Sequence, residues 1–158
     1  MKKFEFTGET KTISLLFRTA TLHRIRAVAE FGLVKIGDLG GWIEKEENLS
    51  HEGKAWVWGN AKVCGDAEVW GNAEVFSASH VLVIGAIGSR DDFTTFFRDK
   101  DNEITVKCGC FLGKIDKFLE KVTQTHGDSK YALVYRAAVE VARLQIDLSG
   151  EAPKDADE

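Results

Sequence analysis

The sequence has little of what marks a secreted, disulfide-bonded or membrane-spanning protein. Proline occurs once in 158 residues, and the three cysteines have no spacing typical of a disulfide framework. No segment approaches the roughly 20 apolar residues that a membrane-spanning helix requires. The segment from Met1 to Phe6 alternates charged and apolar residues and is not followed by the apolar run of a signal peptide. We therefore expect a cytoplasmic protein with reduced thiols and no membrane partner.

Neither sign of charge dominates the chain. Residues 1–80 contain ten Lys and Arg against eleven Asp and Glu, and residues 81–147 contain ten of each. Most of the formal net charge of −4 therefore lies in residues 148–158, which we expect to form a disordered acidic tail. A nearly neutral body argues against binding to duplex nucleic acid, which requires a broad basic surface. It leaves small charged ligands open, because these need only a local pocket.

A six-residue repeat runs from Gly53 to Leu82. Its five blocks are GKAWVW, GNAKVC, GDAEVW, GNAEVF and SASHVL, with alanine and valine at recurring positions. This period fits neither the roughly 3.6 residues per turn of a helix nor the alternation of a lone strand, but it is typical of a hexapeptide β-solenoid. The valines and alanines are predicted to point inward, and the Gly-Asn and Gly-Asp pairs to turn the corners.

The repeat is too short to stand alone. A triangular coil uses about three blocks per turn, so the solenoid predicted over residues 53–82 makes fewer than two turns and needs caps at its ends. We expect residues 1–52 to form an N-terminal cap built from strands. Large aromatic residues fall beside or between the inward valines, namely Trp56, Trp58, Trp70 and Phe76. They are either buried under the caps of the same chain or form a surface for self-association.

Residues 83–147 have the pattern of a separate α+β lobe. Two alternating segments, Phe93–Arg98 and Ile104–Phe111, predict a β-hairpin around a polar turn. Two helices are predicted to follow, burying Ile115, Phe118, Leu119 and Val122 from the first, and Tyr131, Val134, Tyr135, Ala138, Val141 and Ala142 from the second, which runs from about Lys130 to Ile146. The fold class is therefore mainly β with an α+β C-terminal lobe, namely a short left-handed β-solenoid of hexapeptide repeats followed by a β-hairpin and two helices.

No arrangement of residues supports catalysis. Cys108 and Cys110 could bind zinc with His126, but the chain offers no second Cys or His pair, and two thiols on one side of a strand also pack together in a core. A nucleophile made of Cys110 and His126 lacks an orienting group, and Ser89 lacks the flanks of a nucleophile elbow. Hexapeptide acyltransferases, which the repeat also resembles, use many coils, whereas this repeat is short. We therefore expect neither an enzyme nor a metal or other cofactor.

A binding pocket is the better candidate for a functional site. The segment Gly85–Arg90 follows a strand, and its small residues allow backbone N–H groups to approach an anion. The neighbouring strands supply donors and aromatic faces, which suit a nucleotide or phosphoribosyl compound held without chemical change. The candidate ligand-binding residues are Ser89, Arg90, Thr94, Thr95, Phe96, Arg98, Lys107 and Phe111. The residues placed to close the pocket from the helices are His126, Lys130, Tyr131 and Arg136. The alternative is a plain twisted hairpin whose Thr and Phe reflect β-propensity alone.

Both halves of the chain resemble phage-encoded proteins. Residues 22–75, from LHRIR to GNAEV, resemble the polymer-forming hexapeptide-repeat proteins of bacterial prophages. Residues 87–144, from IGSRDD to VARL, resemble a small phage-encoded domain often attached to such repeats. The predicted hairpin and two helices are similar in outline to the phage anti-Thoeris sponge proteins. The most specific segments of the second half are GSR at 88–90, TTF at 94–96, CGCF at 108–111 and HG at 126–127.

The resemblance implies a non-enzymatic phage or prophage protein that acts in the cytoplasm of the host cell. The sponge family sequesters cyclic ADP-ribose signals in pockets between subunits and does not cleave them. Our leading hypothesis is therefore a homo-oligomer that captures a nucleotide-derived immune signal, with Arg and Lys on the phosphates, Phe stacked on the base and Thr hydrogen-bonded. The alternative is a structural or interaction module that assembles through its solenoid and binds or inhibits a host defence protein.

Overall fold

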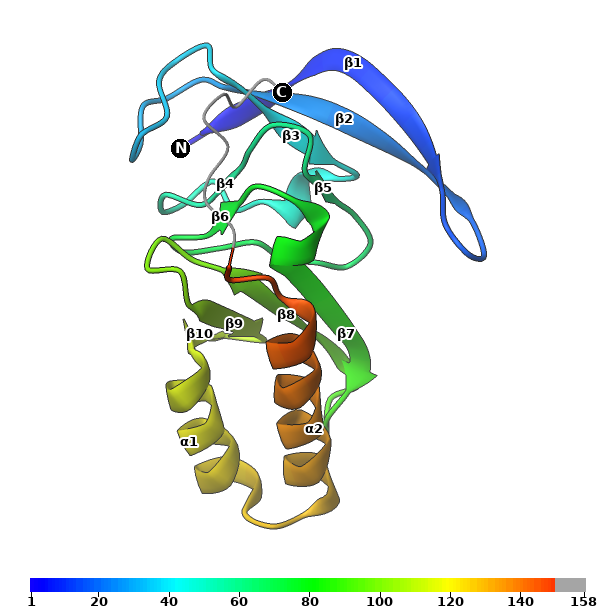
Figure 1. The fold of residues 1–158 in the computed structure, drawn as a ribbon, viewed down its shortest axis with the longest axis vertical. Coiled ribbons are helices and arrows are strands. Elements are labelled where there is room, and N and C mark those ends of the chain that lie inside the picture. The colour runs from blue at the N-terminus through cyan, green and yellow to red at the C-terminus, as the bar shows by residue number, and fades with distance from the viewer. Residues whose placement is uncertain (150–158) are drawn as a thin grey trace.

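The computed structural model describes residues 1–149, which form layers stacked along the long axis of the molecule (Figure 1). A long β-hairpin lies at one end and two α-helices lie at the other, with short strands and an antiparallel sheet between them. Apart from Leu148 and Ser149, the tail predicted over 148–158 lies outside the described residues. Leu148 packs against the helices, and its carbonyl accepts a hydrogen bond from Asn102 Nδ2 at 2.8 Å, so this residue belongs to the folded body.

The N-terminal cap is a sheet with the strand order β1-β2-β3-β5. Strands β1 (Phe4–Ser14) and β2 (Thr19–Ala27) form the long antiparallel hairpin, and β3 (Leu39–Ile43) pairs with β2. The last strand, β5 (Lys62–Val63), comes from the repeat and pairs in parallel with β3. Strands are thus present in residues 1–52 as expected.

Short parallel strands stack within the repeat. Strand β4 (Trp56–Val57) pairs in parallel with β6 (Glu74–Val75), so paired residues lie eighteen positions apart, which is three repeat blocks. An isolated parallel bridge also joins Leu49 to Val69, which lie twenty positions apart. The structure confirms that the repeat buries its small apolar residues, Ala55, Ala61, Ala67, Ala73, Val57, Val63, Val69 and Val75. The glycines that open the first four blocks all have positive φ between 56° and 72°, as the predicted corners require.

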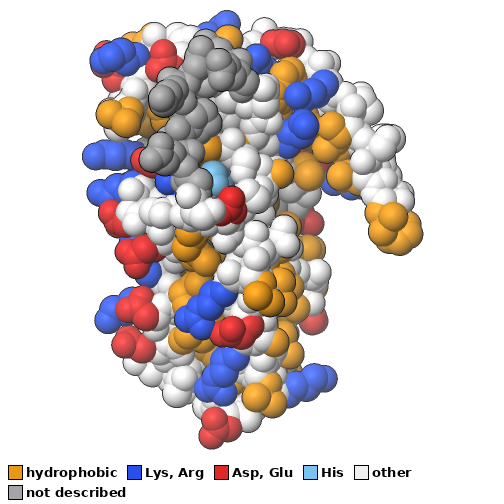
Figure 2. Space-filling view, in the orientation of Figure 1, with side chains coloured by type: hydrophobic (Ala, Val, Ile, Leu, Met, Phe, Trp, Pro, Cys, Tyr) orange, Lys and Arg blue, Asp and Glu red, His pale blue; other side chains and the backbone are white. Residues whose placement is uncertain are grey.

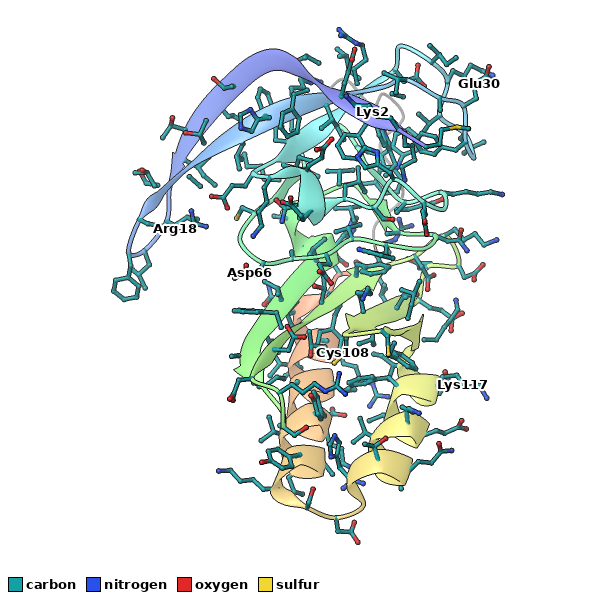
Figure 3. All side chains as sticks on the ribbon, turned by 180° about the vertical axis from the view of Figure 1, so that it is seen from behind. Lys2, Arg18, Glu30, Asp66, Cys108 and Lys117 are labelled. Atoms are coloured by element: carbon teal, nitrogen blue, oxygen red, sulfur yellow. The ribbon has the colours of Figure 1, made fainter. Side chains whose placement is uncertain are left out.

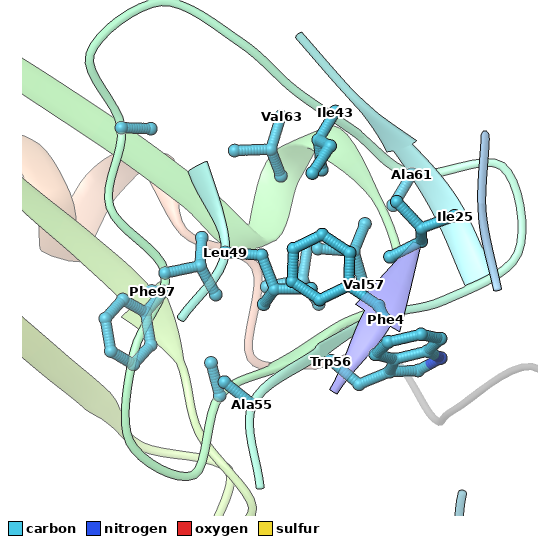
Figure 4. Close-up of a cluster of buried hydrophobic side chains, with 14 of the residues drawn as sticks. Phe4, Ile25, Ile43, Leu49, Ala55, Trp56, Val57, Ala61, Val63 and Phe97 are labelled. Atoms are coloured by element: carbon cyan, nitrogen blue, oxygen red, sulfur yellow. The ribbon is translucent and has the colours of Figure 1, made fainter. Parts of the chain in front are cut away.

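One hydrophobic core joins this stack to the elements on both sides of it (Figure 4). Phe4 and Ile25 of the hairpin contribute from one side, and Phe97 of the antiparallel sheet contributes from the other. Trp56 is buried against the edge of Phe31, with ring centroids 5.3 Å apart. The other repeat aromatics are half-buried: Trp58 packs on Phe76 at 5.5 Å, and Trp70 lies under the Lys107 ammonium at 4.8 Å. Trp56 is therefore buried within the chain, whereas Trp58, Trp70 and Phe76 are only partly covered.

The second sheet is fully antiparallel, with the order β10-β9-β8-β7. Its strands are β7 (Val81–Ile87), β8 (Asp92–Arg98), β9 (Ile104–Cys108) and β10 (Phe111–Lys114). The β8–β9 pairing confirms the predicted hairpin. The second predicted strand, however, ends at Cys108, because Gly109 adopts a positive φ of 56° and turns the chain into β10.

Two helices cover the face of this sheet that points away from the stack: α1 (Ile115–His126) and α2 (Lys130–Gln145). The predicted buried positions of α1 are confirmed apart from Leu119, which is half-buried. In α2, Tyr135, Ala138 and Ala142 are buried as predicted and Val134 is half-buried. Two predicted inward positions, Tyr131 and Val141, are wrong and lie 43% and 46% exposed, because the buried stripe runs instead through Ala132 and Val139. No helix within residues 1–149 is long and apolar enough to cross a membrane.

The buried side chain of Asn48 joins successive layers of the stack. It ends a single 3₁₀ turn (Glu46–Asn48), the counterpart of another at Ala78–His80. Its Oδ1 accepts hydrogen bonds from the N–H groups of Glu44 and Lys45 at 3.1 and 2.9 Å. Its Nδ2 donates to the carbonyls of Gly65 and Ala67 at 3.0 and 2.9 Å. One amide group thus satisfies four backbone groups.

We expect Asn48→Ala to lower the free energy of unfolding by about 3 kcal/mol, because four backbone groups lose a partner in the core. Urea denaturation of the variant and the parent measures this difference. The matched control is Asn60→Ala, which changes an exposed asparagine at a repeat corner and should shift the same quantity by less than about 0.5 kcal/mol. Equal effects of the two substitutions would contradict the assigned role of Asn48.

Candidate functional site

A cavity of about 220 Å³ lies where the turns of the second sheet meet the helices. Cys108, at the end of β9, marks its position between the sheet and the helical pair (Figure 3). The β7–β8 turn, the β9–β10 turn, α1 and α2 all contribute to its wall. The lining residues that carry chemistry are Ser89, Arg90, Asp92, Cys108, Cys110, Phe111, Phe118, Lys121, Thr125, His126 and Tyr135.

Aromatic rings form one wall of this cavity. Phe118 of α1 packs on Phe111 at 5.5 Å and against the edge of Tyr135 at 5.6 Å. His126, at the end of α1, stacks on Tyr135 with centroids 5.7 Å apart and an interplanar angle of 24°. Positions 118, 122 and 126 share one face of α1 because they are four residues apart. The rings of this wall therefore come together because Phe118 and His126 share one face of α1 and because Tyr135 of α2 packs against that face.

Polar groups surround the rings. Arg90 and Lys121 bring positive charge to the cavity, and Asp92 brings one carboxylate. Within residues 1–149, neither Arg90 nor Lys121 forms an ion pair with another side chain. Ser89 and Thr125 add hydroxyl groups that can donate or accept hydrogen bonds. The cavity can therefore hold an anionic group beside an aromatic surface.

Tyr135 connects α2 to the sheet. Burial raises the pKa of its hydroxyl to about 12, and the neighbouring Cys108 thiol and Asp92 carboxylate act in the same direction. A Cβ atom at Gly88 would lie 1.9 Å from the Tyr135 hydroxyl oxygen. Only glycine therefore fits this turn, which also has a positive φ of 82°.

Two larger cavities are less suited to an aromatic anion. One, of about 330 Å³, lies beside Lys45, Asp66, Glu68 and Lys107, and its cations already face acids. The Lys45–Asp66 pair is separated by 3.1 Å and the Lys107–Glu68 pair by 3.7 Å. The other, of about 340 Å³, has a single aromatic residue, Trp58, in its wall.

The structure brings together three of the eight predicted ligand-binding residues. Ser89, Arg90 and Phe111 line the 220 Å³ cavity, whereas Lys107 lines the larger cavity beside the stack. The remaining four are buried away from both, namely Thr94, Thr95, Phe96 and Arg98. The expectation of one shared pocket is therefore wrong. Its physical cause is that the stack covers one face of the sheet and the helices cover the other, which leaves no solvent face.

The buried candidates hold the layers together. Phe96 is completely buried and meets Phe118 edge-on, so a base cannot stack on it. Thr95 Oγ1 accepts a hydrogen bond from the Glu68 N–H at 2.9 Å, across to the stack.

The two cationic candidates outside the cavity have internal contacts as well. Arg98 donates to the Glu74 carbonyl at 3.3 Å and to Asn102 Oδ1 at 2.8 Å. The Lys107 ammonium donates to the Gly109 carbonyl. These cations therefore contribute to packing between the sheet and its surroundings.

From the helices, His126 lines the cavity as predicted, but Lys130, Tyr131 and Arg136 do not. Arg136 instead donates to the Gly127 carbonyl at 3.0 Å and closes the α1–α2 connection. Sequence reasoning missed Lys121, Thr125 and Tyr135 as lining residues. The spacing of Phe118, Lys121 and Thr125 on α1 carried a usable signal, because residues three and four apart share a helix face.

Two cysteines, both with free thiols, also line the cavity. Cys108 Sγ accepts a hydrogen bond from Thr94 Oγ1 at 3.4 Å, while Cys110 is exposed in the turn. Across the described part of the chain, no three His, Cys, Asp or Glu side chains are grouped so that they could hold a metal ion. Cys108, Cys110 and His126, which the sequence offered as possible zinc ligands, therefore do not form such a group.

The chain has two tyrosines, which makes the environment of Tyr135 measurable. In a Tyr131→Phe variant the one remaining tyrosine is Tyr135, whose hydroxyl keeps its proton until about pH 12 because it is buried. We therefore expect the folded variant to contain no tyrosinate at about pH 11. Denaturant should lower the ionisation of Tyr135 to about pH 10, the usual value for tyrosine, as followed by ultraviolet titration with circular dichroism verifying the fold at each pH. An ionisation near pH 10 in the folded variant would contradict the burial of Tyr135.

The chain matches no protein-family model and no curated protein. Function is therefore inferred from the chemistry of the cavity.

Proposed function

We propose that this protein binds, without transforming it, a small anionic compound that carries an aromatic ring, and that the physiological ligand is a nucleotide-derived immune signal. The observation that carries the proposal is one cavity in which Phe111, Phe118 and Tyr135 lie beside Arg90 and Lys121. A nucleotide has the matching parts, because its base offers an aromatic face and its phosphate offers negative charge.

The expected interactions follow from the groups present. Stacking of a base on an aromatic side chain contributes about 1–3 kcal/mol. Arg90 offers a planar donor fork that suits phosphate oxygens, and Lys121 adds a second positive charge. Asp92 lies in the same wall, so the phosphate is expected to approach from the side of Arg90 and Lys121.

The size of the cavity limits how much ligand one chain encloses. Sites that enclose drug-sized ligands have volumes of roughly 300–1,000 Å³, and this cavity has about 220 Å³. One base or one phosphoribosyl group fits that space better than a whole cyclic dinucleotide. The rest of a larger ligand would lie over exposed Ser89 and Cys110 or against a second copy of the chain. We therefore retain a homo-oligomer in the proposal.

The biological setting comes from the resemblance to phage proteins. A sponge that lowers the concentration of an immune signal in the host cytoplasm needs only tight and fast binding. The antiparallel strands followed by two helices support the likeness in outline to anti-Thoeris sponges. Parallel pairing at intervals of eighteen residues likewise supports a short left-handed hexapeptide solenoid over residues 53–82.

A second function is favoured by apolar side chains on the surface. Figure 2 shows hydrophobic groups at the tip of the β1–β2 hairpin and among the charges over the helices. The tip residues Leu16 and Phe17 are 87% and 94% exposed, and Leu144 of α2 is 89% exposed. Such groups suit contact with a protein, as in an interaction module that docks a host defence protein. The expectation from sequence placed this contact on the tryptophans of the repeat, of which Trp56 is buried and Trp58 and Trp70 are half-buried.

The first test is a thermal-shift panel of cyclic dinucleotides, cyclic trinucleotides and cyclic ADP-ribose isomers. We expect one class to raise the melting temperature by several degrees, because a ligand that binds only the native state stabilises it. Chromatography after heat release should recover the compound intact. A cleaved product would identify an enzyme, and no shift with any compound would contradict the proposal.

Substitutions locate the site. Arg90→Ala and Lys121→Ala should each abolish most of the shift and leave the melting temperature of the ligand-free protein within about 2 °C, because neither side chain forms an ion pair with a described residue. The matched control is Lys117→Ala, on the same helix but outside the cavity, where the lysine pairs with Glu120 at 3.5 Å. A loss of the shift in Lys117→Ala equal to that in Lys121→Ala would place binding elsewhere.

A further inference from the structure

Two thiols line the same wall of the cavity, and nothing in the proposed nucleotide site requires them. Cys108 ends β9 and Cys110 occupies the turn that follows, with only Gly109 between them. Cys108 pairs with Phe111 across this two-residue turn. Both thiols are free. A pair of thiols that faces one cavity can react in sequence with one small molecule.

The separation of the two residues permits a disulfide. Even in a fully extended strand, residues two apart have Cα atoms about 6.8 Å apart, which is the upper end of the range that disulfides span. Gly109 between them has a positive φ and turns the chain into β10. Both cysteines line one cavity.

The two thiols differ in access. Cys110 is exposed, whereas Cys108 is half-buried under the Thr94 and Tyr135 hydroxyls. This is the usual arrangement of an attacking thiol beside a resolving thiol. The third cysteine, Cys64, is half-buried between the stack and the N-terminal hairpin, and burial raises its pKa. Cys64 is therefore expected to react with disulfides more slowly than Cys110 and serves as an internal reference for the rate.

The charge of the cavity selects the kind of small disulfide. Arg90 and Lys121 face the same space as the thiols, against the single carboxylate of Asp92. A disulfide that carries carboxylates is attracted to these cations, and a disulfide that carries amines is repelled. Such steering acts on the rate of encounter and weakens as salt is added.

We propose that Cys110 is a modification site for small anionic disulfides, with Cys108 as the resolving thiol. The Cys110 thiolate attacks one sulfur of R–S–S–R, forms the mixed disulfide Cys110–S–S–R and expels RS⁻, which takes a proton from water. The Cys108 thiolate then attacks Cys110 Sγ, forms the Cys108–Cys110 disulfide and expels the second RS⁻. Two protein thiols are oxidised and one disulfide is reduced to two small thiols.

The experiment treats the full-length protein at about pH 8 with oxidised glutathione, which carries carboxylates, or with cystamine, which carries amines. Intact-mass spectrometry and peptide mapping follow the products. With oxidised glutathione we expect the wild type to lose two hydrogens and keep no adduct, through a transient glutathione adduct on Cys110. Cys108→Ser should instead retain one glutathione on Cys110, and Cys110→Ser should react only slowly, at Cys64.

Charge selection is measured by the ratio of the two reaction rates. Glutathione disulfide should modify wild-type Cys110 several-fold faster than cystamine does, and the ratio should approach that of a free thiol in a combined Arg90→Ala and Lys121→Ala variant. Lys117→Ala should keep the wild-type ratio. Because the readout is protein mass, this experiment tests the thiol proposal independently of nucleotide binding.

Three outcomes would overturn the proposal. Modification of Cys64 as fast as that of Cys110 would contradict the assignment of Cys110 as the modification site. A glutathione adduct that persists on wild-type Cys110 would contradict the resolving role of Cys108. Equal rates for the two probes, or a rate ratio that is unchanged when Arg90 and Lys121 are replaced, would contradict the selection for anions.

Discussion

The repeat has an apolar interior that must be covered at both ends, and this requirement organises the rest of the molecule. Its valines and alanines are buried, yet five blocks of six residues offer them few neighbours from the repeat itself. Phe4 and Ile25 close one end and Phe97 closes the other. Full burial of each valine contributes roughly 1.5–3 kcal/mol, so the caps and the repeat stabilise each other. Asn48 adds the polar bonds that keep neighbouring layers in register.

Covering the stack decides where a ligand can bind. The second sheet gives one face to the stack through Phe97 and the other to the helices through Phe96. Phe96 and Phe97 are completely buried on these faces, so an aromatic ligand is expected at the end of the sheet where its turns meet α1. The cavity lies there, and its polar residues come from turns and from the outer side of a helix.

The sequence predicted which residues repeat their burial along the chain, but it did not predict which faces of the second sheet are covered by other layers. Six-residue spacing predicted the buried valines, and alternation with polar turns predicted the β8–β9 hairpin, because both patterns depend on neighbours along the chain. Alternation cannot tell a face covered by another layer from a face open to solvent, and so Thr95 and Phe96 were predicted as ligand contacts. The contact of Gly88 with Tyr135 joins positions 47 residues apart, and no local pattern contains it. The small residues of Gly85–Arg90 predicted a pocket near Arg90 but did not point to Lys121 or Tyr135.

The two proposed activities share a wall, and this has a physical consequence for each. Cys108 lies between Thr94 in the sheet and Tyr135 in α2, while Tyr135 also packs on Phe118 and His126. A disulfide from Cys108 to Cys110 would convert the thiol beside these hydroxyls into a weaker acceptor without an S–H group, and it would fix the turn next to Phe111. Ligand affinity and thiol oxidation are therefore expected to be coupled in both directions, because any free energy by which oxidation alters binding must equally alter the oxidation of the liganded protein.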